Sequence, residues 1–431
     1  MEEESLSMIS TVVPATHQSD ENGVCQLSSM DLLMKLHYIR AVYFFTSDAA
    51  QGLSMADLKK PMFLLLDQAT RAISGRVRIS ESGRAFVKCN DAGVRIAESR
   101  RDRTLQEWFQ QHGCSLEGLV HDHVLGGPDL GFSPLAVVKF TWFKCGGLCV
   151  GLSWSHILGD AFSAFDFITK WSQILAGQTH THTHTHTHAP PKPKPLPTPI
   201  HKQTQSPPHN NDPISVKMTT TAGEFWLPTN HAKIATHSFH VTSKQLNRLV
   251  TTSTCHQNDA AETSYFGTLS ALVWKHVARI RGESEPRAVT IFTRGGEGLE
   301  VSAVEASFVV ATSDVADLAR VIGAERRVDD VAKLVEESGG KGDFVVYGAN
   351  LTLVDLENGG DVYGVVLNGH KPVLANCCIH GVGDDGVVLV LPAPEGFTGG
   401  RMVTVSLPDK ELLQLKDNLR DEWGIESLSF S

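Results

Sequence analysis

The sequence predicts a mixed α/β (α+β) fold divided into two domains. Its 431 residues exceed the size of one ordinary core. In both halves, stretches with helical spacing of apolar residues alternate with short apolar strands. A segment at 178–213, rich in His, Thr and Pro, separates the halves. Because hydrophobic residues make up 41% of the chain, with 19 Phe and 7 Trp, each half can bury a core of its own.

The segment 178–213 marks the boundary between the expected domains. Thr and His alternate over 179–188, and six prolines follow between 190 and 199. Proline removes backbone donors and the segment has few apolar side chains, so we expect a disordered linker between domains at 1–177 and 214–431. Histidines at alternate positions could bind a soft metal, but simple-sequence expansion explains the run, and no metal site is predicted.

The elements of the first half follow from apolar spacing and turn residues. Residues 30–38 are expected to form a helix capped by Ser28 or Ser29, and 55–73 has the spacing of a longer helix. Strands are expected at 40–45, 76–79, 84–88, 137–143 and 148–154. The glycines at 146–147 predict a hairpin between the last two of these strands.

The second half repeats the mixture of helices and strands. Residues 265–280 carry an apolar stripe at helical spacing, with Lys275 and Arg279 on the opposite face. These two cations fit either a solvated helix face or contacts to phosphate groups. The other elements expected are strands at 236–241, 289–293, 386–391 and 401–406, and a closing helix at 410–419.

Charge and composition limit the classes of partner. The formal net charge is −10 and no Lys/Arg-rich run is present, so nucleic acid is not an expected partner. Residues 1–16 lack the basic and apolar regions of a secretory signal, and no apolar run reaches about 18 residues, so we expect a cytoplasmic protein with at most peripheral membrane association. The eight cysteines are scattered, which favours reduced thiols over a zinc site.

His156 and Asp160 are the candidate catalytic residues. An apolar strand ends at His156, and Asp160 stands where an amphipathic helix over 161–175 would begin. Imidazole titrates near neutrality, so a fixed histidine can accept the proton of a hydroxyl or amine that attacks a carbonyl. Asp160 would cap the helix or hold an arginine and thereby orient the turn. Alone, a His and an Asp four residues apart also occur by chance.

The surroundings of this pair resemble the active-site hairpin of the BAHD acyltransferases, plant enzymes that use acyl-CoA donors. The similarity lies in 132–148 (FSPLAVVKFTWFKCGGL), which runs into the HxxxD segment, and extends to 13–14 (VP), 27–31 (LSSMD) and 269–275 (LSALVWK). The resemblance implies two chloramphenicol-acetyltransferase-like domains that meet at a channel. It implies a monomer that binds acyl-CoA as substrate or ligand and has no other cofactor.

The resemblance also assigns roles to individual residues. His156 would be the general base that activates the acceptor for attack on the thioester. Asp160 would be structural and would pair with an arginine of the second domain, for which Arg294 stands at the matching place. A plain surface turn is the alternative for Arg294, which precedes Gly295 and the next glycine along the chain.

Three positions depart from the family pattern. Ala161 replaces the glycine that usually follows the motif aspartate. The second family motif, DFGWG, is degenerate here: it is represented only by 361–365 (DVYGV), with Asp361 and Gly364 as its candidate residues. Residues 350–352 (NLT) replace a Ser/Thr-Trp pair that lines many family sites.

These departures are typical of the eceriferum and glossy branch of the family. Three further segments resemble that branch: 34–45 (MKLHYIRAVYFF), 347–352 (YGANLT) and 379–384 (IHGVGD). The branch implies a role in cuticular wax formation at the cytosolic face of the endoplasmic reticulum. There the protein would promote very-long-chain fatty acyl-CoA elongation as a partner of the elongase condensing enzyme. An active acyltransferase that acylates an alcohol, phenol or amine is the alternative.

Overall fold

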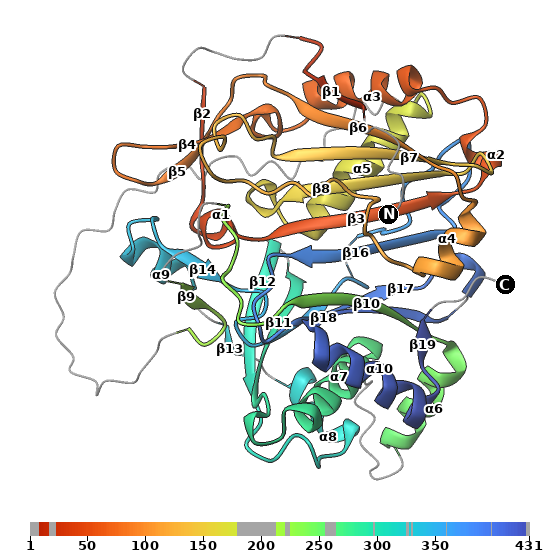
Figure 1. The fold of residues 1–431 in the computed structure, drawn as a ribbon. Helices are drawn as coiled ribbons and strands as arrows, with labels where there is room; N and C mark the ends of the chain where they lie inside the picture. The colour runs from red at the N-terminus through yellow and green to blue at the C-terminus, as the bar shows by residue number, and fades with distance from the viewer. Residues whose placement is uncertain are drawn as a thin grey trace.

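The computed structural model describes residues 8–16, 23–178, 213–219, 225–254, 264–295, 298–324, 327–328, 331–358, 360–397 and 399–427. The expected linker at 178–213 falls almost entirely outside these residues, and the Thr/His run lies wholly outside them. The described residues form a mixed α/β fold built on two large sheets, shown in Figure 1, as the sequence predicts.

The first sheet has six strands in the order β1-β6-β7-β8-β3-β16. Their bounds are β1 Met8–Val12, β6 Val94–Arg101, β7 Ala136–Phe143, β8 Leu148–Ser155, β3 Tyr38–Phe45 and β16 Leu374–His380. Helices α3 (Met55–Gln68) and α5 (Ala161–Leu175) pack together on it. Trp171 of α5 lies 5.5 Å from the Phe140 ring and donates to the Leu58 carbonyl of α3. Buried aromatic packing thus fixes α5, the helix that follows His156.

The second sheet has eight strands in the order β13-β12-β11-β15-β17-β18-β10-β19. Their bounds are β13 Arg327–Val328, β12 Gly298–Glu305, β11 Ala288–Gly295, β15 Leu351–Asp355, β17 Val387–Pro392, β18 Arg401–Pro408, β10 Ile234–Val241 and β19 Glu426–Ser427. Figure 1 shows a group of helices beyond its outer face: α6 Ser243–Thr254, α7 Tyr265–Arg281, α8 Val315–Gly323 and α10 Asp409–Trp423. Successive residues of β11 face opposite ways: Ile291 packs in the core beneath α7, and Phe292 packs in the core shared with the first sheet.

Smaller elements join the two halves. Strands β2 (Val24–Gln26), β5 (Ala85–Lys88) and β4 (Arg76–Ile79) form a three-stranded sheet, and β14 (Asp343–Val345) pairs with β9 (Lys217–Thr219). The remaining helices are α1 Ser29–Leu33, α2 Ser47–Ala50, α4 Leu105–His112 and α9 Val331–Glu337, with short 3-10 turns at Arg71–Ser74, His156–Leu158, Gly282–Ser284 and Glu395–Phe397. Helix α1 contacts α9, so these small elements bridge sequence-distant segments.

Strand β16 is the main connection between the halves. It comes from the second half of the chain, yet it pairs antiparallel with β3 at the edge of the first sheet, with Asn376 opposite Val42. The Asn376 side chain, 1% exposed, makes four hydrogen bonds. Its Nδ2 donates to the Cys114 carbonyl and to Ser238 of β10, and its Oδ1 accepts from Thr404 of β18 and from the Cys377 backbone. One saturated buried amide therefore ties the two sheets together.

Two helix predictions were too long. The helix expected at 30–38 is α1, which ends at Leu33, and Tyr38 already begins β3. The helix expected at 55–73 is α3, which ends at Gln68 because Ala69 is extended at ψ 171°; a 3-10 turn follows. The expected hairpin of β7 with β8 is confirmed, and the expected strands at 76–79 and 84–88 are β4 and β5, which also pair antiparallel. Strands β6, β12, β15 and β16 were not predicted.

Within the described residues, no helix combines the length and the apolar character needed to cross a membrane.

We predict that the Asn376→Leu variant lowers the free energy of unfolding by about 2–3 kcal/mol, because it leaves the Cys114 carbonyl without its Asn376 donor and takes one of two hydrogen-bond partners from each of the buried Ser238 and Thr404 hydroxyls. Chemical denaturation measures this loss. The control is Asn247→Ala, at an exposed position of α6, which is expected to stay within about 0.5 kcal/mol of wild type. Equal stabilities of the two variants would contradict the bridging role of Asn376.

Candidate active site

His156 sits at the end of a fully buried strand. Strand β8 runs to Ser155, and a 3-10 turn over His156–Leu158 follows at once. The His156 backbone N–H donates to the His37 carbonyl at 3.1 Å, which fixes the turn against the segment before β3. The turn ends at Gly159, whose φ of 129° favours glycine. The imidazole is 3% exposed.

Asp160 has the geometry of a helix cap. It precedes α5, and its Oδ1 accepts from the Ser163 backbone N–H and from the Ser163 hydroxyl, both at 2.9 Å. A carboxylate at this position satisfies an otherwise unpaired donor and interacts favourably with the helix dipole. Ala161 is the first residue of α5 and is buried. This geometry agrees with a structural role for Asp160, because its carboxylate is engaged by the helix and not by the imidazole.

Arg294 reaches the same helix by a different contact from the one expected. It lies near the end of β11, it is exposed, and its guanidinium carbon stands 5.1 Å from the centre of the Phe162 ring. The described residues include no ion pair between Arg294 and Asp160. Arg294 therefore packs on the first turn of α5 as a cation over an aromatic face, and its pairing with Asp160 stays a prediction.

The Tyr347 hydroxyl forms a hydrogen bond with Nε2 of His156. The two atoms lie 3.1 Å apart, and Tyr347 is 2% exposed. The tyrosine ring is held by the stacked Phe292 ring at 4.8 Å and by the His37 ring at 5.0 Å and nearly perpendicular. Both neighbouring rings are fully buried. Tyr347 and Phe292 come from the second half of the chain, so both halves build this site.

Burial fixes the protonation of the pair. It lowers the pKa of His156 below its ordinary value, and Asp160 only partly opposes this shift. We assign the proton of the neutral imidazole to Nδ1, so that Nε2 keeps a lone pair towards the Tyr347 hydroxyl. Burial raises the pKa of Tyr347, which therefore stays protonated. The Tyr347 O–H accordingly donates to Nε2.

Close backbone contacts at two glycines bring Tyr347 next to His156. A Cβ on Gly381 would lie 2.3 Å from the Leu36 carbonyl oxygen, and one on Gly348 would lie 2.5 Å from the Gly383 carbonyl oxygen. The Val346 N–H donates to His37 Nε2 at 3.1 Å. The three branch-like segments at 34–45, 347–352 and 379–384 therefore meet beside His156, which no local sequence pattern indicates.

His156 has the properties of a general base, but its Nε2 atom is already hydrogen-bonded to the Tyr347 hydroxyl. A neutral imidazole with a lone pair on Nε2 could accept a proton from an attacking hydroxyl or amine. To do so here, an acceptor must first displace a buried phenol from a hydrogen bond. The site described is therefore closed at the atom that would carry the chemistry.

The degenerate second motif supports α5 from outside. Asp361 is exposed, and its Oδ1 accepts from the Tyr363 backbone N–H at 2.9 Å. A Cβ on Gly364 would lie 3.1 Å from Oγ1 of Thr169 in α5, so the motif packs tightly against that helix. The Tyr363 hydroxyl donates to the Ala375 carbonyl of β16. Asp361 and Gly364 thus have structural contacts and none to His156.

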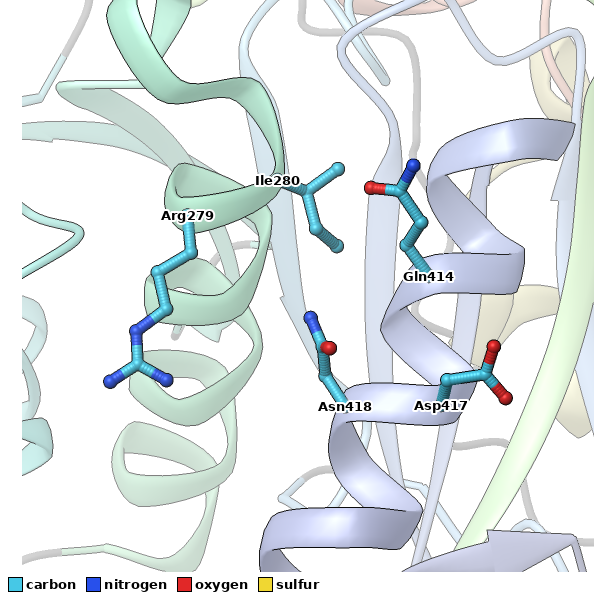
Figure 2. Close-up of a pocket in the computed structure, with 5 residues that line it drawn as sticks. All are labelled: Arg279, Ile280, Gln414, Asp417 and Asn418. Carbon is cyan, nitrogen blue, oxygen red and sulfur yellow. The ribbon is translucent and has the colours of Figure 1, made fainter.

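A surface depression lies far from this chemistry, between α7 and α10 (Figure 2). It has a volume of about 410 Å³ and is lined by Arg279, Ile280, Gln414, Asp417 and Asn418. Arg279 instead pairs with Glu422 of α10, at 3.0 and 3.1 Å, as expected for a solvated helix face. The depression belongs to the outer face of the second sheet, whereas His156 faces the core between the sheets. The described residues contain no group of three or more side chains suited to hold a metal ion.

Sequence reasoning missed Tyr347, Phe292 and His37 as residues of the site. Tyr347 was noticed only as part of a segment, because its position beside His156 depends on contacts between residues nearly 200 positions apart. The sole local signal is a tyrosine at the start of a glycine-containing turn between two short strands.

Comparisons with known proteins identify relatives over the whole chain. The family model described as the Transferase family matches residues 6–294. The chain is 38% identical to Protein ECERIFERUM 2 of Arabidopsis thaliana, over 95% of this chain and 96% of that protein. It superposes on vinorine synthase with a TM-score of 0.68 at 18% identity, over 99% and 98% of the two chains. The F. graminearum TRI101 protein in complex with ethyl coenzyme A gives 0.69 at 14% identity, over 94% and 99%.

We predict that Tyr347→Ala exposes His156 to diethylpyrocarbonate, which acylates unprotonated imidazole. In wild type, burial is expected to slow modification of His156 by at least roughly tenfold relative to the exposed His231. Peptide mass spectrometry after a timed reaction measures both rates. Tyr43→Ala is the matched control, since it empties a similar volume around another fully buried tyrosine. Modification of His156 at the His231 rate in wild type would contradict the closed site.

Stability is expected to fall with acidification, in part through His37. Burial, and after it the repulsion that a protonated His156 would exert, lowers the pKa of His37 to about 3. Below pH 6.5 the His37 side chain binds a proton in the unfolded chain but not in the folded chain. The contribution of neutral His37 to the free energy of unfolding is therefore complete above pH 6.5 and is lost as the pH falls towards 3. Each such histidine gives a slope of up to about 1.4 kcal/mol per pH unit.

Urea unfolding between pH 7 and pH 5 measures this slope. His37→Gln keeps an acceptor for the Val346 N–H but cannot titrate, so its slope is expected to be smaller by one proton. His231→Gln, at an exposed position, is expected to keep the wild-type slope. Identical slopes for wild type and His37→Gln would show that His37 does not contribute.

Proposed function

The chain belongs to the BAHD transferase family, in its eceriferum branch, and on this premise we propose that it acts in cuticular wax formation by promoting the elongation of very-long-chain fatty acyl-CoA. In this role it would act at the cytosolic face of the endoplasmic reticulum, as a monomeric partner of the elongase condensing enzyme. The high identity to an eceriferum protein along nearly the full chain supports the branch and the role in wax.

The single observation that carries a non-catalytic role is the hydrogen bond between Tyr347 and His156 Nε2. A general base must present its lone pair to the acceptor, within about 2.6–3.2 Å. Here a buried hydroxyl already lies at that distance, and stacked rings hold it there. Promotion of elongation does not require this lone pair, because the condensing enzyme itself would form the carbon–carbon bond.

An acyl-CoA is the expected ligand in either case. The fold is shared with a protein that holds ethyl coenzyme A. The long acyl chain of a wax precursor would need apolar surface, and we propose that the protein shields or relays this chain next to the condensing enzyme. No other cofactor enters the proposal.

An active acyltransferase is the second candidate, and the intact HxxxD motif favours it. Burial keeps His156 neutral, and with its lone pair assigned to Nε2 the ring has the form that a general base requires. In this case Tyr347 would have to swing away when an alcohol, phenol or amine binds. His156 would then take the acceptor proton, the acceptor would attack the thioester carbonyl, and CoA would leave as the thiol.

We predict that His156→Ala restores acyl chain lengths in a wax-deficient plant as well as wild type does, because elongation does not use the imidazole. Lipid analysis of the cuticle measures the distribution of chain lengths. Purified wild type is expected to release no CoA from acyl-CoA across a broad panel of alcohols, phenols and amines. His231→Ala provides a matched histidine removal at an exposed position.

Two outcomes would decide against the elongation proposal. Loss of the longest products with His156→Ala, while the variant protein accumulates and stays folded, would assign turnover to His156. Release of CoA by wild type with one acceptor class, abolished in His156→Ala, would establish the transferase activity.

A further inference from the structure

Two cysteines lie face to face in the three-stranded sheet. Cys25 is the middle residue of β2, opposite Val87 of β5, and Cys89 follows β5 directly. The Cys89 backbone N–H donates to the Gly23 carbonyl at 2.9 Å, so the ladder continues past both residues. Cys25 and Cys89 are therefore diagonal neighbours on one face. Their Sγ atoms are 2.7 Å apart.

This pair differs from the other cysteines of the described residues. Cys25 is half-buried, while Cys89 is 3% exposed and lies beneath it. The hydrogen bond from Cys89, aided by Arg71, lowers the pKa of Cys25 to about 7, although burial opposes the shift. Cys89 keeps its proton, since its pKa is raised. By contrast, burial raises the pKa of Cys114 to about 12 and also raises that of Cys377.

We propose that Cys25 and Cys89 form a redox-active dithiol, a modification site at which a low-molecular-weight disulfide such as oxidised glutathione closes a Cys25–Cys89 disulfide bond. The geometry points to this chemistry, because the two sulfurs lie 2.7 Å apart, close to the S–S bond length of about 2.05 Å. A soft metal is the poorer fit, since no third ligand accompanies the pair among the described residues.

The reaction balances as two thiol–disulfide exchanges. The Cys25 thiolate attacks one sulfur of oxidised glutathione, the glutathione S–S bond breaks, and one glutathione leaves as a thiolate that takes up a proton. Cys89 then loses its proton and attacks the Cys25 sulfur of the mixed disulfide, and the second glutathione leaves. The two protein thiols lose two electrons together, and one oxidised glutathione becomes two reduced molecules.

The disulfide bond would restrain β2 and the helix α1 that follows it, next to the His156 turn. Strand β2 leads directly into α1, whose Asp31 acts electrostatically on His156. Ser29 of α1 hydrogen-bonds Glu336 of α9, and Arg84, at the other end of β5, also pairs with Glu336. A bond between β2 and β5 would therefore restrain the segments of the first half that contact α9 of the second half. This inference does not depend on whether His156 turns over.

The test is trapping of thiols after equilibration of the full-length protein in glutathione buffers from reducing to oxidising. Acid quenching, alkylation and peptide mass spectrometry then show which cysteines are joined. We expect a Cys25–Cys89 linked peptide in wild type and in Cys145→Ser, which removes an exposed cysteine as the matched control. Oxidation is also expected to raise Tm by roughly 5 °C, because the bond closes a long loop of the unfolded chain.

Single variants test the order of attack. Cys89→Ser is expected to accumulate a glutathione adduct on Cys25, because the resolving thiol is gone. Cys25→Ser is expected to react far more slowly at Cys89, which is buried and protonated. The proposal is overturned if both cysteines stay alkylated in the most oxidising buffer, if Cys25 joins another cysteine, or if the two single variants form adducts at equal rates.

Discussion

The antiparallel pairing of β16 with β3 is the constraint on which the rest of the structure depends. It places seven residues of the second half in the first sheet and carries Gly381 to within contact of the Leu36 carbonyl. Gly383 then packs on Gly348, and Tyr347 comes to lie over His156. Asn376, in the same strand, hydrogen-bonds Ser238 of β10 and Thr404 of β18 and so holds the second sheet against the first. Side chains larger than hydrogen at Gly381 or Gly348 would push these segments apart.

The buried site is stable because the donors and acceptors that meet there match: the Nε2 lone pairs of His37 and His156 face an N–H and an O–H group. A charged imidazole without a buried anion beside it would cost several kcal/mol. His37 and His156 avoid this cost by staying neutral, His37 as acceptor of a backbone N–H and His156 as acceptor of a phenol. Tyr347 serves as the donor for one and as an aromatic neighbour for both. The same arrangement that makes burial tolerable removes the lone pair from use.

The sequence was sufficient for the features that local chemistry decides. Apolar spacing located α5 and α7, the paired glycines located the β7–β8 hairpin, and Asp160 was correctly expected to cap a helix. Features that depend on distant contacts could not be predicted. β16 is a short apolar run whose partner lies over 300 positions away, and the closure by Tyr347 follows from that pairing. Arg294 had two possible interaction partners on the segment after His156, the Asp160 carboxylate and the Phe162 ring, and no spacing rule distinguishes them.

Retention of the HxxxD motif does not by itself imply turnover, since each motif residue has a structural partner. Asp160 satisfies the first turn of α5, and without it an N–H at that helix end would lose its acceptor, at a cost of about 1 kcal/mol. His156 satisfies the Tyr347 hydroxyl, which a smaller apolar residue would leave buried and unpaired, at a cost of about 1–3 kcal/mol. Stability alone would therefore preserve both residues. By the same reasoning, the second motif could degenerate because only its contacts to α5 and β16 are needed, and the present residues provide them.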